Sequence, residues 1–244
     1  MPALDLNWSD SELLPPVVYP DTAFLFDRMT EATLEMLDCC GEQMILDIGC
    51  GNGADCFALE RDGRCVVGLD PSQTMLKKAK GGIDARGSRV ALVRAIGEQL
   101  PFENHSFDRV MCKGALDHFY DPAETIAEIA RVLKPSGKVA ISIANFASLS
   151  CRLVKRDIPP DHNYRFDYSL LRAMIGDYLE IEECIGVSLL WGLPLWGKLL
   201  AKSPARISMA TLKFLDNIAQ RLPTLSDVIV LRCCPKPAMF AEQL

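Results

Sequence analysis

The feature that most constrains this chain is a short apolar run that ends in an acid and three alternating glycines, Met44-Ile45-Leu46-Asp47-Ile48-Gly49-Cys50-Gly51-Asn52-Gly53. This pattern predicts a buried parallel strand, a tight turn and the start of a helix. Glycine suits such a turn because a side chain would stop the backbone from turning sharply and from lying flat against a ligand. We therefore expect a ligand site at this turn.

The spacing of the glycines limits the kind of ligand. The dinucleotide fingerprint has the spacing G-x-G-x-x-G, and a phosphate loop ends in G-K-[ST]. Here Gly49, Gly51 and Gly53 alternate and no lysine follows them. Asp47 stands at the strand end, where its charge would repel a pyrophosphate but pair with a cation. The turn therefore disfavours a phosphate ligand.

A second acid, Asp70, closes the next apolar run, Cys65-Val66-Val67-Gly68-Leu69. In open α/β sheets a carboxylate at this place accepts hydrogen bonds from ribose hydroxyls. At a strand end we expect it to be open to solvent. Asp47 and Asp70 together fit a nucleoside that carries a positive group and no phosphates.

Strand and helix patterns alternate along the chain, which favours right-handed crossovers and an α/β fold with a doubly wound, mostly parallel seven-stranded sheet. A helical insertion, 190–225, precedes the last strand. The expected strands are 43–48, 64–69, 89–94, 108–113, 138–144, 179–189 and 226–233. The expected helices are 21–41, with Asp21 as its N-cap, 54–61, 73–80, 121–133 and 168–177.

Composition describes an ordinary globular protein. The 244 residues are 49% hydrophobic and 24% charged, which suits one domain with a full core, 1–244. The net charge of -6 opposes nucleic-acid binding. No secretory signal and no apolar run of membrane-spanning length are visible, so we expect a cytoplasmic protein.

The ten cysteines fit neither a disulfide framework nor a zinc site. They include the adjacent pairs Cys39-Cys40 and Cys233-Cys234, and no C-x-x-C spacing occurs. Reduced thiols in a cytosolic protein are the simplest interpretation. We expect no metal site.

Three further blocks follow the glycine turn in order: Asp108-Arg109-Val110-Met111-Cys112, Leu116-Asp117-His118-Phe119 and Ala130-Arg131-Val132-Leu133-Lys134-Pro135-Ser136-Gly137. With the turn, they make residues 43–145 resemble the class I S-adenosylmethionine-dependent methyltransferases, especially the type 11 group that includes ubiquinone- and menaquinone-biosynthesis enzymes. The resemblance implies S-adenosyl-L-methionine as cofactor, a Rossmann-like methyltransferase fold and a hairpin of the last two strands.

The resemblance also implies a cofactor site. Asp47, Gly49 and Gly51 would hold the methionine part, Asp70 the ribose, and Ile96 with Gly97 the adenine. The family commonly has an acid where this chain has Ile96, so the polar contact to adenine would come from the backbone. The other positions that match the site are Cys50, Gly53, Pro71 and Lys113.

Methyl transfer from a sulfonium needs alignment and exclusion of water rather than a metal or a fixed triad. A general base helps when the acceptor is a hydroxyl or a carbon acid, and histidine suits that role near neutral pH. His118 is the first candidate, although it would equally fit packing on the cofactor or capping a helix. His162 is a candidate for touching the acceptor.

The insertion combines tryptophan, leucine and lysine. Trp191 and Trp196 are candidate substrate contacts, and Lys198 and Lys202 are interleaved with leucines. A cap over an apolar acceptor pocket, a membrane face, a homodimer face and plain core packing all stay open. Its positive charge on an acidic protein favours an anionic or negatively polarised partner.

These features lead to one functional prediction, methyl transfer to a small, largely apolar acceptor at oxygen or carbon. An arm and helix, 1–41, would precede the cofactor-binding core, 43–145, and residues 146–166 and 190–225 would form the acceptor side. One alternative is a non-catalytic S-adenosylmethionine-binding or scaffold domain. Another is a nicotinamide-dependent oxidoreductase, which the glycine spacing disfavours. Fold and cofactor site do not identify the acceptor.

Overall fold

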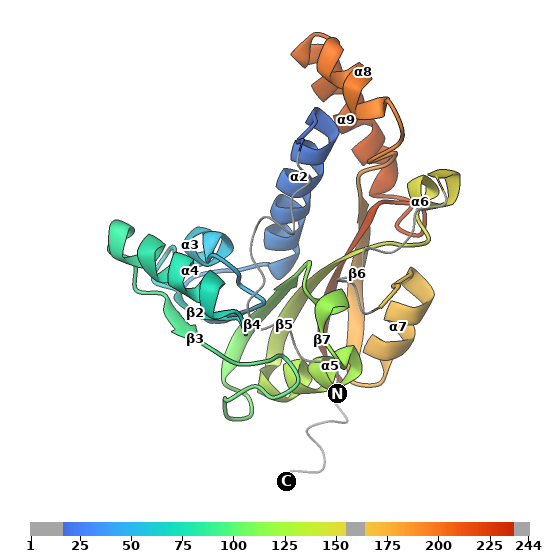
Figure 1. Cartoon of the computed structure of the whole chain (residues 1–244). Helices are drawn as coiled ribbons and strands as arrows, with labels where there is room; N and C mark the ends of the chain where they lie inside the picture. Colours follow the sequence, from blue (N-terminus) through green and yellow to red (C-terminus); the bar gives the residue numbers. More distant parts are fainter. Residues whose placement is uncertain (1–16, 155–163, 237–244) are drawn as a thin grey trace.

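The computed structural model describes residues 17–154 and 164–236. At its centre lies one seven-stranded sheet of order β3-β2-β1-β4-β5-β7-β6 (Figure 1). The strands are β1 (Met44–Ile48), β2 (Cys65–Leu69), β3 (Ala91–Val93), β4 (Phe107–Lys113), β5 (Leu133–Ala144), β6 (Leu179–Val187) and β7 (Val228–Pro235). The predicted fold class, including the insertion before the last strand, is confirmed.

The first five strands pair in parallel, and β7 lies antiparallel between β5 and β6. The expected hairpin of β6 and β7 is therefore present. Because β5 and β6 both oppose β7, β6 runs in the same direction as β5. Its carboxyl end lies at the same edge of the sheet as the carboxyl ends of β1 and β4, which is where ligands of such sheets bind.

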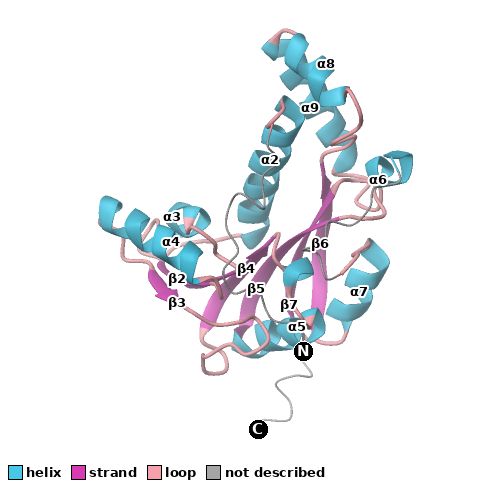
Figure 2. Cartoon of the chain, viewed as in Figure 1, coloured by secondary structure: helices cyan, strands magenta, loops and turns pink. Residues whose placement is uncertain are grey.

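Helices cover both faces of the sheet (Figure 2). Successive strand residues point to opposite faces, so Ile45 packs into one core cluster and Leu46 into the other. On the first face lie α2 (Pro20–Leu37), α3 (Ala54–Leu59) and α4 (Gln73–Arg86). On the second lie α5 (Pro122–Val132) and α7 (Tyr168–Gly176).

Three predicted helix ends are wrong, each for a local reason. The helix predicted to run to residue 41 ends at Leu37, because Asp38 adopts a left-handed backbone with φ 51° and caps it. The helix that begins at Pro20 has no side-chain cap, and Asp21 instead lies in its first turn, where Oδ2 accepts the Gly192 N–H at 3.2 Å. The helix predicted to stop at residues 81–82 continues to Arg86. Gly82 allows close packing, because a Cβ there would come 2.9 Å from Phe57 Cζ and the ring would have to shift.

The insertion forms α8 (Trp196–Lys202) and α9 (Ala205–Ala219), which lie beside the amino-terminal half of α2 at one end of the molecule (Figure 1). Their contact with α2 contains a small apolar cluster of Phe24, Leu200 and Leu212. A largely buried ion pair joins Arg28 Nε of α2 to Asp216 Oδ2 of α9 at 3.0 Å. The insertion is therefore fixed to α2.

Short elements complete the carboxyl edge of the sheet. The 3₁₀ helix η1 (Leu116–His118) follows β4, and α6 (Leu149–Val154) follows β5. The second of these lies in the segment 146–166, for which the sequence pattern gives no regular structure.

Candidate functional site

The glycine turn after β1 adopts a backbone that requires glycine. The φ angles of Gly49, Gly51 and Gly53 are 75°, 52° and 78°, in the left-handed region that side chains disfavour. A Cβ on Gly49 would lie 2.6 Å from the Cβ of Ala115, which follows β4. The turn is therefore pressed against the segment between β4 and η1.

The backbone donors of the turn are engaged by β2. The N–H groups of Gly49 and Cys50 both donate to the Leu69 carbonyl, at 2.8 and 3.0 Å. The Gly51 N–H donates to Asp70 Oδ2 at 2.9 Å. A phosphate loop would direct such donors at its ligand. This turn directs them at its own neighbouring strand.

Asp70 is completely buried, so the expectation that its carboxylate is open to solvent is wrong. The physical reason is the glycine turn, which folds back onto it. Its Oδ1 accepts the N–H of Ser72, the N-cap residue of α4, at 2.8 Å. Burial raises the pKa of this carboxyl. Each oxygen keeps one lone pair for a further donor.

A cation and two carboxylates meet where β1 and β4 end. Asp47 is 2% exposed and accepts from Cys56 Sγ at 3.3 Å. Burial first, and then the charge of Asp55, raise its pKa to about 7. Lys113 Nζ pairs with Asp55 Oδ2 at 2.9 Å and donates to Thr30 Oγ1 of α2 at 2.8 Å. We call Asp47, Asp55 and Lys113 the charge cluster.

The segment after β3 lies against the start of α5. Ile96 is half-buried and Gly97 is buried. Glu98 holds the segment in place, because its Oε1 accepts the N–H groups of Tyr120 and Asp121 at 2.8 and 3.1 Å. Its Oε2 is buried without a hydrogen-bond partner among the described residues. Pro71 lies just after β2, and its carbonyl accepts a hydrogen bond from Arg94 Nε, just after β3, at 3.0 Å.

His118 ends η1 and is half-buried. The same short segment carries Ala115, the residue pressed against the glycine turn. The structure thus brings this histidine to the carboxyl edge of β1 and β4, although its role in catalysis stays a prediction. His162 lies outside the described residues.

The two tryptophans of the insertion pack toward α2. Trp191 donates from Nε1 to Thr22 Oγ1 at 3.2 Å, and its N–H donates to Asp227 Oδ2 at 2.9 Å. Trp196 is half-buried against the small cluster that contains Phe24. Contact of either ring with an acceptor stays a prediction.

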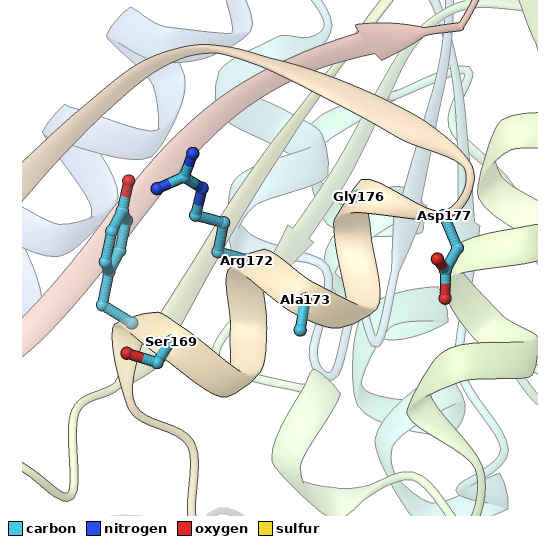
Figure 3. A pocket seen from close by; sticks show the side chains of 6 residues that line it. Ser169, Arg172, Ala173, Gly176 and Asp177 are labelled. Carbon is cyan, nitrogen blue, oxygen red and sulfur yellow. The ribbon is translucent and has the colours of Figure 1, made fainter.

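Two surface hollows lie away from the glycine turn. One of about 510 Å³ runs along α7, and is lined by Ser169 and Arg172 of that helix and by its C-cap residue Asp177 (Figure 3). The other, of about 360 Å³, lies between Tyr19 at the start of α2 and residues 191–198. The charged groups gather instead at the carboxyl edge of the sheet, which is where ligands of this topology bind.

Three side chains at this edge are not among the site residues that the sequence predicts. Asp55 carried a weak signal, as an acid in the first turn of the helix after the glycines. Glu98 follows two residues after Ile96, the position at which the family commonly has an acid. Thr30 carried no signal, because it meets Lys113 only after α2 has folded back over the sheet.

Comparison with known proteins gives a consistent result. The model of a family described as a methyltransferase domain matches residues 46–141. A ubiquinone biosynthesis O-methyltransferase from Saccharophagus degradans is 31% identical over 159 residues, which cover 60% of this chain and 67% of that protein. Methyltransferase GfsG from Streptomyces halstedii is 33% identical over 138 residues, which cover 55% of this chain but only 48% of that protein.

The fold also matches a solved structure. The PH0226 protein from Pyrococcus horikoshii superposes with a TM-score of 0.65 at 21% identity, covering 94% of this chain and 100% of that one. The family match and the identity to the Saccharophagus degradans protein show that the chain belongs to the class I S-adenosylmethionine-dependent methyltransferases. Its cofactor is S-adenosyl-L-methionine.

Among the residues that the structure describes, no helix combines the length and the apolar composition that crossing a bilayer requires.

Asp47 should make the protein less stable as the pH rises. Its pKa is raised from 3.8 to about 7 in the fold. Between about pH 4 and 7 the folded state therefore keeps a proton that the unfolded chain has lost, and the free energy of unfolding falls with increasing pH. Asp47→Asn should remove this decline, so that the variant is the more stable protein at neutral pH.

Thermal unfolding without cofactor across this pH range measures the effect. Asp84→Asn is the matched control, because that carboxylate pairs with Lys80 on the exposed surface of α4. Parallel pH curves for the parent and Asp47→Asn would show that the pKa of Asp47 is not raised.

Proposed function

We propose that this protein transfers the methyl group of S-adenosyl-L-methionine to an oxygen atom of a small, largely apolar acceptor. The main support for the cofactor site is the charge cluster at the carboxyl ends of β1 and β4. The choice of oxygen is supported by the O-methyltransferase from Saccharophagus degradans, with carbon as the alternative. In this proposal residues 43–145 bind the cofactor, and 146–166 and 190–225 form the acceptor side.

The charge cluster complements the amino-acid end of the cofactor. That end carries an ammonium group and a carboxylate, and the cluster offers two acids and one lysine. Asp47 is proposed to receive the ammonium, and Lys113 the carboxylate, in exchange for part of its pairing with Asp55. A buried carboxyl whose pKa is about 7 is uncharged in part near neutral pH, and a cation beside it would favour its charged form.

The nucleoside end is proposed to lie over the turn and the segment after β3. Asp70 would accept from the ribose hydroxyls, which requires the backbone at Gly51 to shift, because the carboxylate is covered there. Pro71 would flank the ribose. Ile96 would pack on the adenine face, and Gly97 would leave room for it.

His118 is proposed as the base. The bound cofactor supplies an electrophilic methyl group, so the protein must align the acceptor and remove its proton. His118 lies on the segment pressed against the glycine turn, within the edge where the acceptor would enter. An imidazole near neutral pH can take a hydroxyl proton as the methyl group arrives.

The oxidoreductase alternative has less support. A dinucleotide needs free backbone donors for its pyrophosphate, and here the Gly51 N–H is held by the Asp70 carboxylate. Asp47 would add repulsion.

Cofactor binding tests the site. Calorimetry should detect S-adenosylhomocysteine binding and no NADH binding. Asp70→Asn keeps the size of the side chain but removes charge-assisted hydrogen bonds, so the affinity for S-adenosylhomocysteine should fall by about 10- to 150-fold, corresponding to about 1.5–3 kcal/mol.

Asn is preferred to Ala at this position because its Oδ1 can still accept one of the two N–H groups, whereas Ala would leave those of both Gly51 and Ser72 without acceptors. Asp84→Asn is again the control. Unchanged affinity of the Asp70→Asn variant would remove Asp70 from the site, and tight NADH binding would refute the proposed cofactor site.

The role of His118 can be separated from simple packing. If it is the base, His118→Gln should lower the turnover number by about 10²–10⁴-fold while the affinity for S-adenosylhomocysteine stays within a factor of two to three. The rate is measured as transfer of labelled methyl into the organic-solvent extract of cells. Lost affinity with normal turnover at saturation would assign His118 to packing, and no loss of either would remove it from the site.

A further inference from the structure

The helices α8 and α9 form one end of the molecule (Figure 1). Large apolar side chains are exposed there. Leu195 is 66% exposed, Leu199 59%, Ile207 59% and Phe214 63%. Four exposed cations accompany them, Lys198, Lys202, Arg206 and Lys213. We call these four apolar residues and four cations the basic tip. Scattered exposed leucines are ordinary, but a cluster on one small projection needs an explanation.

Helical spacing orders the basic tip into stripes. Lys198 and Lys202 of α8 are four residues apart, and Leu195, the N-cap residue just before α8, precedes Leu199 by four. On α9, Ile207 precedes Phe214 by seven residues, and Arg206 precedes Lys213 by seven. Residues four or seven apart share one face of a helix. Each helix therefore carries an exposed apolar stripe beside a basic stripe.

The charge of the tip is opposite to that of the chain. No carboxylate occurs between Glu183 and Asp216, whereas the whole chain has a net charge of -6. Asp216 does not neutralise the tip. It is 3% exposed and is engaged by Arg28 and by the N–H of Ser188.

The occupant must therefore be apolar and negatively charged. A second copy of the chain fits poorly, because a two-fold interface places the same surface on both sides and would set Lys and Arg against Lys and Arg. An anionic bilayer supplies acyl chains for the apolar stripes and phosphate groups for the basic ones. Amphipathic helices with this combination lie in the membrane interface.

We propose that the basic tip docks on an anionic lipid bilayer. The apolar stripes of α8 and α9 enter the boundary between headgroups and acyl chains, and the cations contact lipid phosphates. The Arg28–Asp216 pair joins α9 of the tip to α2.

The basic tip and the charge cluster are connected to the same edge of the sheet. The strand β6 delivers the insertion to the carboxyl edge of the sheet, which is also the edge of the charge cluster. A docked molecule would turn this edge toward the bilayer. Resting on the proposed function, this points to an apolar acceptor that is dissolved in the lipid.

Vesicle binding tests the docking without any assay of methyl transfer. The full chain should co-sediment with vesicles of phosphatidylcholine and phosphatidylglycerol at low salt, and not with phosphatidylcholine alone. Lys198→Gln combined with Lys202→Gln should weaken binding by about 30-fold, since each cation at an anionic surface contributes about fivefold. Phe214→Ser should weaken it by at least about tenfold.

Matched controls lie on other helices. Lys77→Gln combined with Lys78→Gln removes two exposed cations from α4, and Leu170→Ser removes an exposed apolar side chain from α7. These controls should bind vesicles like the parent. Calorimetric binding of S-adenosylhomocysteine by every variant verifies that it is folded, and keeps a failure of docking distinct from a failure of the cofactor site.

Several results would overturn the docking. No binding to anionic vesicles, or equal binding to neutral ones, would contradict it. Tip variants that bind like the parent would place any membrane contact elsewhere. A dimer in solution that Phe214→Ser dissolves, without vesicle binding, would assign the tip to a second copy.

Discussion

The meeting of Lys113 with two carboxylates organises much of this molecule. The lysine ends β4, Asp55 lies in the first turn of α3, and Thr30 brings α2 to the same ammonium group. Because α2 also holds the insertion through Arg28, the position of α8 and α9 depends on how α2 lies across the sheet. The charged groups at the carboxyl edge are thus linked to the most distant part of the fold.

Burial of these groups makes sense as preparation for a ligand rather than as a source of stability. A carboxyl such as Asp47, with its pKa raised to about 7, is costly to charge in the folded protein. A zwitterionic ligand would give these buried charged groups direct partners in place of the water that they lose on folding. Proteins commonly retain such unfavourable groups at functional sites. The covered Asp70 fits the same account, because a ribose would replace part of the contact that the glycine turn now makes with it.

The sequence predicts the structure best where one local pattern determines the backbone. The three glycines, the acid at each strand end and the alternation of strands with helices predict the turn, the sheet and the place where the insertion leaves it. The sequence predicts the structure less well where contacts between distant segments determine a helix end or the burial of a side chain. The glycines at 81–82 suggest a helix stop, yet α4 continues through Gly82, where the Phe57 ring packs closely. The burial of Asp70 depends on a turn that folds back from β1. Thr30 and Lys113 meet across 83 residues, which no local pattern reports.

The proposed pairing of Asp47 with the cofactor ammonium is tested most directly by counting protons. Calorimetric titration of S-adenosylhomocysteine near pH 6.5, in buffers of different ionisation enthalpy, gives the number of protons released on binding. Since a carboxyl with a pKa of about 7 is largely protonated at that pH and would ionise beside a cation, the account predicts release of roughly half a proton or more, and none from Asp47→Asn. Equal proton release by the parent and the variant would contradict it.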